Sequence, residues 1–130
     1  MTQPAPKAAT NALDHEAEML EDLYPAYTDE GGAQMQVMRE LTLKAFAPFL
    51  RGGRALELGC SDGFMTKAFA DRFDHLQVID GAHSSVEAAR ALGRDNIVAS
   101  HSLFEQAEVE AGTFDAVFAV YILEHVLDPG

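Results

Sequence analysis

The chain has 130 residues, of which 48% are hydrophobic and 23% are charged. This size and composition suit one folded domain with its own core. Nine Lys and Arg residues stand against 21 Asp and Glu residues, so the formal net charge is −12. That field repels nucleic acid phosphates and anionic membrane surfaces, and we expect neither as a partner.

Cysteine content and hydropathy indicate the compartment. Cys60 is the single cysteine, which excludes an internal disulfide and cannot form a structural zinc site by itself. The first residues lack the apolar run of a signal peptide, and nowhere do 18 apolar residues follow one another. We therefore expect a soluble protein of the cytoplasm.

The first 50 residues predict a tail followed by helices. Residues 1–12 contain small residues and two prolines, which is typical of a disordered tail. Residues 13–50 predict a short acidic helix, capped by Asp14 and stopped by Pro25, and then a longer helix from Ala33. In the longer helix, apolar side chains recur every three or four residues and predict one buried stripe, formed by Met38, Leu41, Ala45, Phe46 and Phe49.

From residue 51 onward, strand patterns and helix patterns alternate. Strands are predicted at residues 54–58, 75–79, 96–99 and 114–121. Helices are predicted at 62–73 and from Ser84, where Glu87 completes a capping box. This order is typical of an α/β fold, and we expect a Rossmann-like parallel sheet with helices on both faces.

The end of the chain lies close behind the fourth predicted strand. Only residues 122–130 follow it, so we expect a sheet that lacks the C-terminal strands usual for such a fold. Central parallel strands normally pair on both sides, and a four-stranded sheet leaves an apolar edge. Either the chain is part of a longer protein or another surface covers this edge, and self-association would provide one.

The turn Glu57-Leu-Gly-Cys-Ser-Asp-Gly63 joins the first predicted strand of the sheet to a helix. A glycine turn there offers free backbone N–H groups to a polar or anionic ligand. A phosphate-binding loop would need Gly-Lys-Ser/Thr at its end, and Phe64 follows the last glycine instead. A dinucleotide fingerprint starting at Gly59 would need glycine at Ser61 and Phe64, which disfavours NAD.

Two carboxylates flank this turn. Asp80 ends the second predicted strand, 23 residues beyond Glu57. An acidic residue at that strand end is suited to accept hydrogen bonds from the ribose hydroxyls of a nucleoside. A carboxylate before the turn suits a ligand that carries positive charge nearby, and together these features favour a nucleoside with a cationic, zwitterionic tail.

Three segments resemble one known family. LELGCSDG, VIDGAHSS and FDAVFAVYILEHVLDP are similar to motif I, the end of strand two and motif IV of the class I S-adenosylmethionine-dependent methyltransferases, over roughly residues 33 to 129. The resemblance implies S-adenosyl-L-methionine as cofactor and methyl transfer to a small-molecule acceptor by in-line displacement. It also implies that residues 13–50 form a lid and the cofactor-carboxylate side, and that residues 51–130 form a partial cofactor-binding domain.

Carried over residue by residue, the resemblance implies a set of cofactor contacts. Around the methionine part of the cofactor it puts Glu57, Gly59, Cys60 and Gly63. It assigns the ribose to Asp80, and the adenine to Gly81 and to a backbone N–H near Phe104. It implies that the Ala119 carbonyl accepts from the methionine ammonium, and that Arg39 pairs with the cofactor carboxylate. A solvated arginine beside the apolar stripe is the alternative for Arg39.

No catalytic residue is identified. His125, next to Glu124, invites a role as general base, and orienting the loop is the alternative. Cys60 suits packing in the turn better than nucleophilic attack, since no histidine is placed beside it. Some relatives of this family hold a divalent metal through a carboxylate at the position that Tyr121 has here. Because tyrosine replaces that carboxylate, no metal is expected. Two other classes remain open, a non-catalytic interaction or assembly module with a vestigial site and an NAD-binding oxidoreductase.

Overall fold

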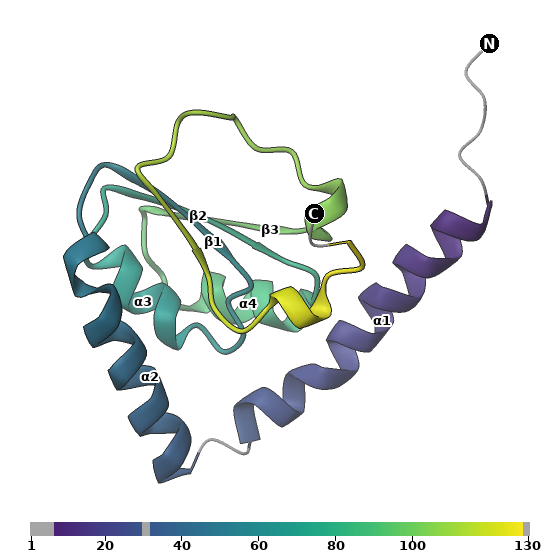
Figure 1. Cartoon of the computed structure of the whole chain (residues 1–130), viewed down its shortest axis with the longest axis horizontal. Helices are drawn as coiled ribbons and strands as arrows, with labels where there is room; N and C mark the ends of the chain where they lie inside the picture. The colour runs from purple at the N-terminus through teal and green to yellow at the C-terminus, as the bar shows by residue number, and fades with distance from the viewer. Residues whose placement is uncertain (1–6, 30–31, 129–130) are drawn as a thin grey trace.

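The computed structural model describes residues 7–29 and 32–128. Its centre is a parallel sheet of strand order β3-β2-β1-β4 (Figure 1). The strands are β1 (Arg54–Leu58), β2 (His75–Asp80), β3 (Ile97–His101) and β4 (Ala116–Ala119). Each predicted strand is confirmed, with ends that move by at most two residues, and the Rossmann-like α/β class is confirmed with them.

The hydrophobic core lies between one face of the sheet and two helices, α3 (Phe64–Ala70) and α4 (His83–Ala91). Parallel pairing sets Glu57 of β1 opposite Val78 of β2 and Phe118 of β4. Phe69 of α3 stacks on Phe118, with ring centroids 4.2 Å apart. Since alternate residues of a strand share a face, these side chains define the helix-covered side of the sheet.

The opposite face of the sheet is crossed by the β3–β4 connection, which includes the 3-10 helix η2 (Phe104–Gln106) (Figure 1). Val98 and Val117 are 64% and 56% exposed. Helices are expected on both faces of the sheet. In the described structure, α-helices cover one face, and the other face has the connection with its 3-10 turn. Along the described chain, no helix is both long and apolar enough for a membrane span.

The N-terminal helices differ from the prediction. Helix α1 spans Lys7–Asp29 and continues through Pro25, so the predicted stop at this proline is wrong. Of the predicted tail, residues 1–6 lie outside the described part, and residues 7–12 are helical. Ala8, Ala9 and Ala12 explain that extension, because alanine has the highest helix propensity.

Helix α2 (Ala33–Phe46) continues into the 3-10 turn η1 (Ala47–Phe49), and its predicted buried stripe is confirmed at Phe46 but wrong at its other positions. Met38, Leu41 and Phe49 are 41%, 56% and 64% exposed. The residues that pack on the core are Leu43, Phe46 and Leu50. Both sets have helical spacing, so periodicity indicates a helix without showing which of its faces meets the sheet.

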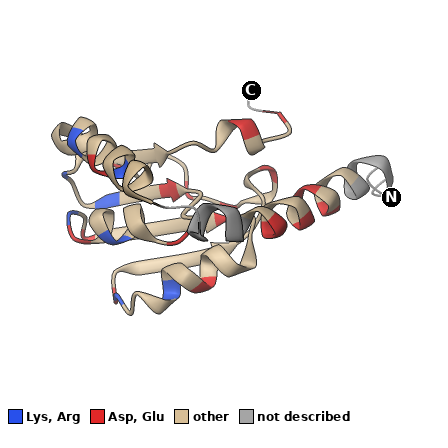
Figure 2. Ribbon diagram, turned by 90° about the horizontal axis from the view of Figure 1, so that it is seen from below, with Lys and Arg blue, Asp and Glu red and all other residues tan. Residues whose placement is uncertain are grey.

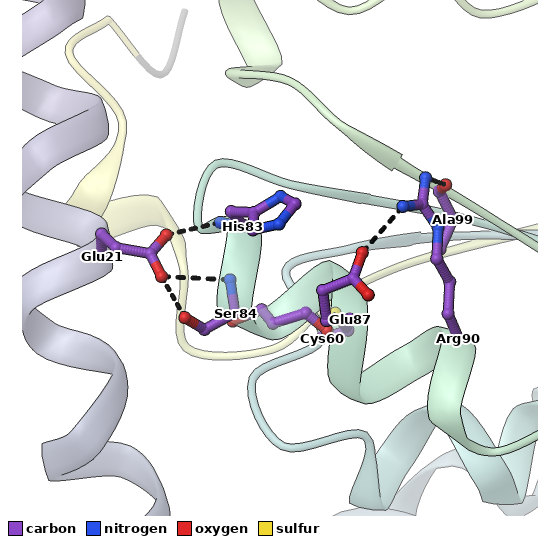
Figure 3. A network of polar contacts seen from close by, with 8 residues as sticks. Glu21, Cys60, His83, Ser84, Glu87, Arg90 and Ala99 are labelled. Carbon is purple, nitrogen blue, oxygen red and sulfur yellow. Dashed lines mark hydrogen bonds and ion pairs between the residues drawn. The ribbon is translucent and has the colours of Figure 1, made fainter.

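The predicted capping box of α4 is also wrong. The helix begins at His83 and has no side-chain cap from its own N-terminal residues. Instead, the Glu21 carboxylate of α1 accepts from the backbone N–H groups of His83 (2.5 Å) and Ser84 (3.1 Å) and from the Ser84 hydroxyl (Figure 3). Glu87 pairs with Arg90 at 2.9 Å. The cap thus comes from a distant helix, which a local motif cannot reveal.

Candidate functional site

A cavity of about 360 Å³ lies at the carboxyl ends of β1, β2 and β4. Its volume is within the range of small-molecule sites. Helices α1 and α2, the turn after β1 and the segments after β2, β3 and β4 all contribute to its wall. Lining residues include Leu20, Met38, Arg39, Glu57, Gly59, Cys60, Asp80, Gly81, Phe104 and Tyr121.

The turn after β1 follows a left-handed path at Gly59 (φ 80°), Ser61 (φ 48°) and Gly63 (φ 85°). The Gly59 N–H donates to the Ile79 carbonyl at 2.8 Å. A Cβ added at Gly59 would lie 2.5 Å from Cγ2 of Ile122. Glycine is therefore required at position 59 by backbone conformation and by the close approach of Ile122.

Asp80 fastens this turn to the end of β2. Its carboxylate accepts hydrogen bonds from the N–H groups of Cys60 (2.8 Å), Ala82 (2.8 Å) and Ser61 (3.4 Å). The residue is 8% exposed and lines the cavity. Because a carboxylate has about four lone-pair sites, these contacts leave acceptor capacity towards the cavity.

Glu57 is a buried carboxyl group at the cavity wall. It is 1% exposed, and its Oε2 has no hydrogen-bond partner among the described residues. Burial, and then the nearby Asp80, raise the pKa of Glu57 to about 8, although the Thr66 hydroxyl acts in the opposite direction. An orphaned oxygen of this kind suits a cationic group or a proton donor of a ligand.

Arg39 projects from α2 to the other side of the cavity. Its Nη2 lies 2.9 Å from Oδ2 of Asp62, and its guanidinium carbon lies 5.0 Å from the centroid of the Phe64 ring. It is the one lysine or arginine among the lining residues in the described ranges. The cavity therefore has carboxylates on the turn side and a cation on the α2 side.

Cys60 is 4% exposed, and its thiol donates to the Ser85 carbonyl at 3.3 Å (Figure 3 shows Cys60 near the start of α4). Burial, and then the negative charges of Asp80 and Glu57, raise the pKa of this thiol above its usual range. A thiol that resists ionisation is a poor nucleophile. The interpretation of Cys60 as a packed residue is confirmed.

The remaining predicted residues divide into two groups. Gly81 and Phe104 line the cavity, and a Cβ at Gly81 would lie 2.5 Å from Cδ1 of Leu20. Gly63 lies instead beside a neighbouring depression. Ala119, exposed at the end of β4, is not among the described lining residues, although Tyr121 is.

The sequence assigns residues 13–50 to a lid by resemblance and singles out Glu124 and His125, but it does not identify Leu20 of α1 or Ile122 after β4. Leu20 and Ile122 line the cavity, and their apolar side chains have no local pattern that separates them from core residues. Glu124 and His125 also line it, with Oε1 and Nε2 3.5 Å apart. Within the part of the chain that the structure describes, no three His, Cys, Asp or Glu side chains gather as a metal ion would require.

The fold and the cavity together define a class of protein. The strand order reverses direction at β1, and the cavity lies outside the strand ends at this point. This is where open α/β sheets bind nucleotides and nucleosides. The chain is a Rossmann-like α/β protein with a cavity of that kind.

Residues 32–130 match a family model described as a methyltransferase domain, and the chain belongs to this family. The ubiquinone biosynthesis O-methyltransferase of Hahella chejuensis is 36% identical over 84 residues, which are 62% of this chain and 35% of that protein. The protein of the same name from Methylocella silvestris is 37% identical over 82 residues, or 61% and 32% of the two chains. The chain thus spans about a third of the length of these curated relatives.

Solved structures support the fold. The N-methyltransferase NodS of Bradyrhizobium japonicum, in complex with S-adenosyl-l-homocysteine, has a TM-score of 0.64 at 21% identity over 91% of this chain and 59% of NodS. A phosphoethanolamine N-methyltransferase of Haemonchus contortus, with phosphoethanolamine and S-adenosylhomocysteine, has a TM-score of 0.69 at 15% identity, over 88% and 27%. At these identities the likeness concerns the fold.

Proposed function

We propose that this chain is the cofactor-binding part of an S-adenosylmethionine-dependent methyltransferase that acts on a small-molecule acceptor. The observation that carries the proposal is the buried Glu57 carboxyl, whose Oε2 lacks a partner among the described residues at the wall of the cavity. A positively charged, amino-acid-bearing nucleoside fits this cavity, since it offers a cation for Glu57. Membership in the methyltransferase domain family supports the same ligand.

We assign the residues of the cavity accordingly. Glu57 faces the ammonium of the methionine part, and the Ala119 carbonyl, outside the described lining of the cavity, is the second acceptor that we propose for it. Gly59 and Cys60 line the cavity and give the backbone a close approach to this part of the ligand, whereas Gly63, outside that lining, keeps the turn in its left-handed path. Arg39, opposite them, pairs with the carboxylate, for which a guanidinium fork has matching geometry.

The nucleoside half of the ligand belongs, in this proposal, to the segments after β2 and β3. Asp80 accepts from the ribose with the acceptor capacity that its three backbone contacts leave. Gly81 and the backbone near Phe104 lie along the adenine. Leu20 of α1 closes this end of the cavity, consistent with a lid role for the N-terminal helices.

When bound, S-adenosylmethionine supplies a methyl group on a sulfonium, which is a good leaving group. The task of the protein is then to orient the reactants and exclude water, which in model reactions lowers barriers by about 7–11 kcal/mol. Glu57 and Arg39 fix the two charged ends of the amino-acid part, and Asp80 fixes the ribose. His125 lines the cavity and is the candidate that could accept a proton from an acceptor.

Names of relatives support a small-molecule acceptor, because the curated relatives are O-methyltransferases of ubiquinone biosynthesis. We further propose that the protein acts in the cytoplasm. The buried free thiol of Cys60 is consistent with a reducing compartment.

Calorimetric titration of wild-type protein and Asp80→Asn with S-adenosylhomocysteine and with NADH tests the proposal. We expect wild type to bind the first ligand and not NADH. Asp80→Asn should weaken binding by about tenfold, because it removes a charge-assisted hydrogen bond. Asp95→Asn, on the exposed α4–β3 connection, is the matched control. Binding of NADH without binding of S-adenosylhomocysteine would overturn the proposal in favour of an oxidoreductase.

A further inference from the structure

Asp62 joins two walls of the cavity through one carboxylate. Its Oδ1 accepts from the Phe64 N–H at 3.1 Å, which closes a local turn at the start of α3. Its Oδ2 pairs with Nη2 of Arg39 on α2 at 2.9 Å. The turn after β1 and helix α2 are thereby linked across 23 residues of sequence by a single side chain.

The guanidinium of Arg39 is held from a second side by an aromatic ring. Its carbon lies 5.0 Å from the Phe64 ring centroid, a distance at which the ring face attracts a cation. The Arg39 and Asp62 side chains are 19% and 26% exposed, whereas those of the Arg94–Asp71 pair are 38% and 44% exposed. The more shielded pair is less screened by water and salt, so it fixes the guanidinium more firmly.

The ion pair leaves donors of Arg39 for a ligand. A guanidinium has five N–H groups in a planar fork, and the described contact with Asp62 involves Nη2. Besides Glu57 and His125, the other titratable side chains that line the cavity include Asp62, Asp80 and Glu124, which carry carboxyl groups. Arg39 is therefore the basic side chain, among the lysines and arginines of the described lining, that can pair with an anionic group in this cavity.

We propose that Asp62 is a positioning residue: together with Phe64 it holds the Arg39 guanidinium in the orientation that selects nucleosides with a carboxylate-bearing tail. This inference rests on the proposed function, and it adds the residue that determines specificity for the tail. Asp62 itself lines the cavity, and the role proposed for it is to orient Arg39. Its effect on binding passes through Arg39 and is confined to ligands that carry the carboxylate.

Two nucleosides separate this role from a structural one. S-adenosylhomocysteine carries the amino-acid tail, and 5′-methylthioadenosine lacks it. In calorimetric titrations, Asp62→Asn should weaken binding of the first by about five- to tenfold, the size expected when one charge-assisted contact is lost. Binding of the second should stay within about twofold. The asparagine oxygen can still accept from the Phe64 N–H, so the local turn is retained.

Asp71→Asn is the matched control, because it breaks the exposed Arg94–Asp71 pair of 2.8 Å outside the cavity. It should change neither affinity. A second variant, Arg39→Gln, should reproduce the selective loss, and adding Asp62→Asn to it should have little further effect, since the two residues act as one unit.

The outcomes decide between the hypotheses. Equal weakening of both nucleosides in Asp62→Asn would overturn the inference in favour of a structural role for the turn. Unchanged or tighter binding of S-adenosylhomocysteine would overturn it too, because Asp62 would then be inert or would compete for Arg39. Wild-type protein that binds neither nucleoside would instead overturn the proposed function.

Discussion

Ser61 holds a backbone conformation that costs free energy. Its φ of 48° lies in the left-handed region, and its Oγ is buried with no partner among the described residues. Left-handed backbone costs a non-glycine residue roughly 1–2 kcal/mol. A glycine at this position would lower the free energy of unfolding by about 0.5–1 kcal/mol, because its unfolded chain has more conformational entropy. The relief of the left-handed strain is the larger of the two effects.

Ser61→Gly should therefore raise the free energy of unfolding by about 1 kcal/mol, measured by urea denaturation. Gly59→Ala is the contrasting variant. It should lower the free energy of unfolding by roughly 1 kcal/mol or more, because φ is 80° and Ile122 occupies the space of a Cβ. A less stable Ser61→Gly protein would contradict the expectation and would show that the Ser61 hydroxyl forms a stabilising contact.

Glu57 makes the stability of the fold depend on pH. Its pKa is raised from 4.5 to about 8 by burial and by Asp80. Between these two values the folded state holds a proton that the unfolded state has lost. The free energy of unfolding should therefore fall as pH rises from about 4.5 to about 8 and level off above that range.

Glu57→Gln should flatten this decline, because glutamine has no proton to lose. Urea denaturation of both proteins across the interval from about pH 5 to pH 8 is the measurement. The lowered pKa values of Glu21 and Asp115 remove stability only as pH falls towards the acid range, so they do not mask the effect. An equal slope in the variant would mean that another group is responsible.

At the scale of elements, one carboxylate attaches helix α1 to the sheet domain. Glu21 caps the start of α4, and Leu20 beside it reaches Gly81 at the cavity. The loss of a helix cap costs about 0.5–2 kcal/mol. Glu21→Ala should therefore let α1 detach locally without unfolding the sheet.

Hydrogen exchange read by mass spectrometry checks this expectation. Peptides from α1 and the start of α4 should exchange about two- to thirtyfold faster in Glu21→Ala, whereas peptides from β1 and β2 should not change. Glu18→Ala, an exposed position on the same helix, is the control and should leave all rates as they are. Unchanged exchange in α1 would show that apolar contacts alone hold the helix.

The same elements show what the sequence can predict. Strands β1 to β4 and the turn at Gly59 were predictable, because short apolar runs and glycines are local signals. The packed face of α2 and the cap of α4 were not. Leu43 and Leu41 are equally apolar, and only the sheet decides which is covered. The contact of Glu21 with Ser84 joins residues 63 apart, where no local motif applies.

The candidate site follows the same division. Asp80 and Glu57 could be identified from the sequence, because Asp80 ends a predicted strand and Glu57 belongs to the motif I segment. Leu20 and Ile122 were not, since their place at the cavity depends on how α1 and the segment after β4 fold back. Asp62 had no signal of its own, as its importance comes from the approach of Arg39 on α2.

At the scale of the whole molecule, an open sheet edge is opposed by net charge. Strand β4 is the last strand of the described sheet, and Val117 on it is 56% exposed. Such an edge favours pairing with a second copy. The net charge of −12 opposes it by repulsion, and Figure 2 shows Asp and Glu residues gathered along α1 and near the C-terminus, with no Lys or Arg in the coloured part of α1.

Salt should therefore shift this balance. Raising the ionic strength from about 0.01 M to about 1 M shortens the screening length from about 30 Å to about 3 Å, and the sedimentation coefficient of the 130-residue chain should rise with it. Val117→Lys should suppress the rise, because a charge beside β4 blocks pairing. Val37→Lys, 53% exposed on α2, is the matched control and should not. Suppression by the Val37 variant alone would instead assign the contact to α2.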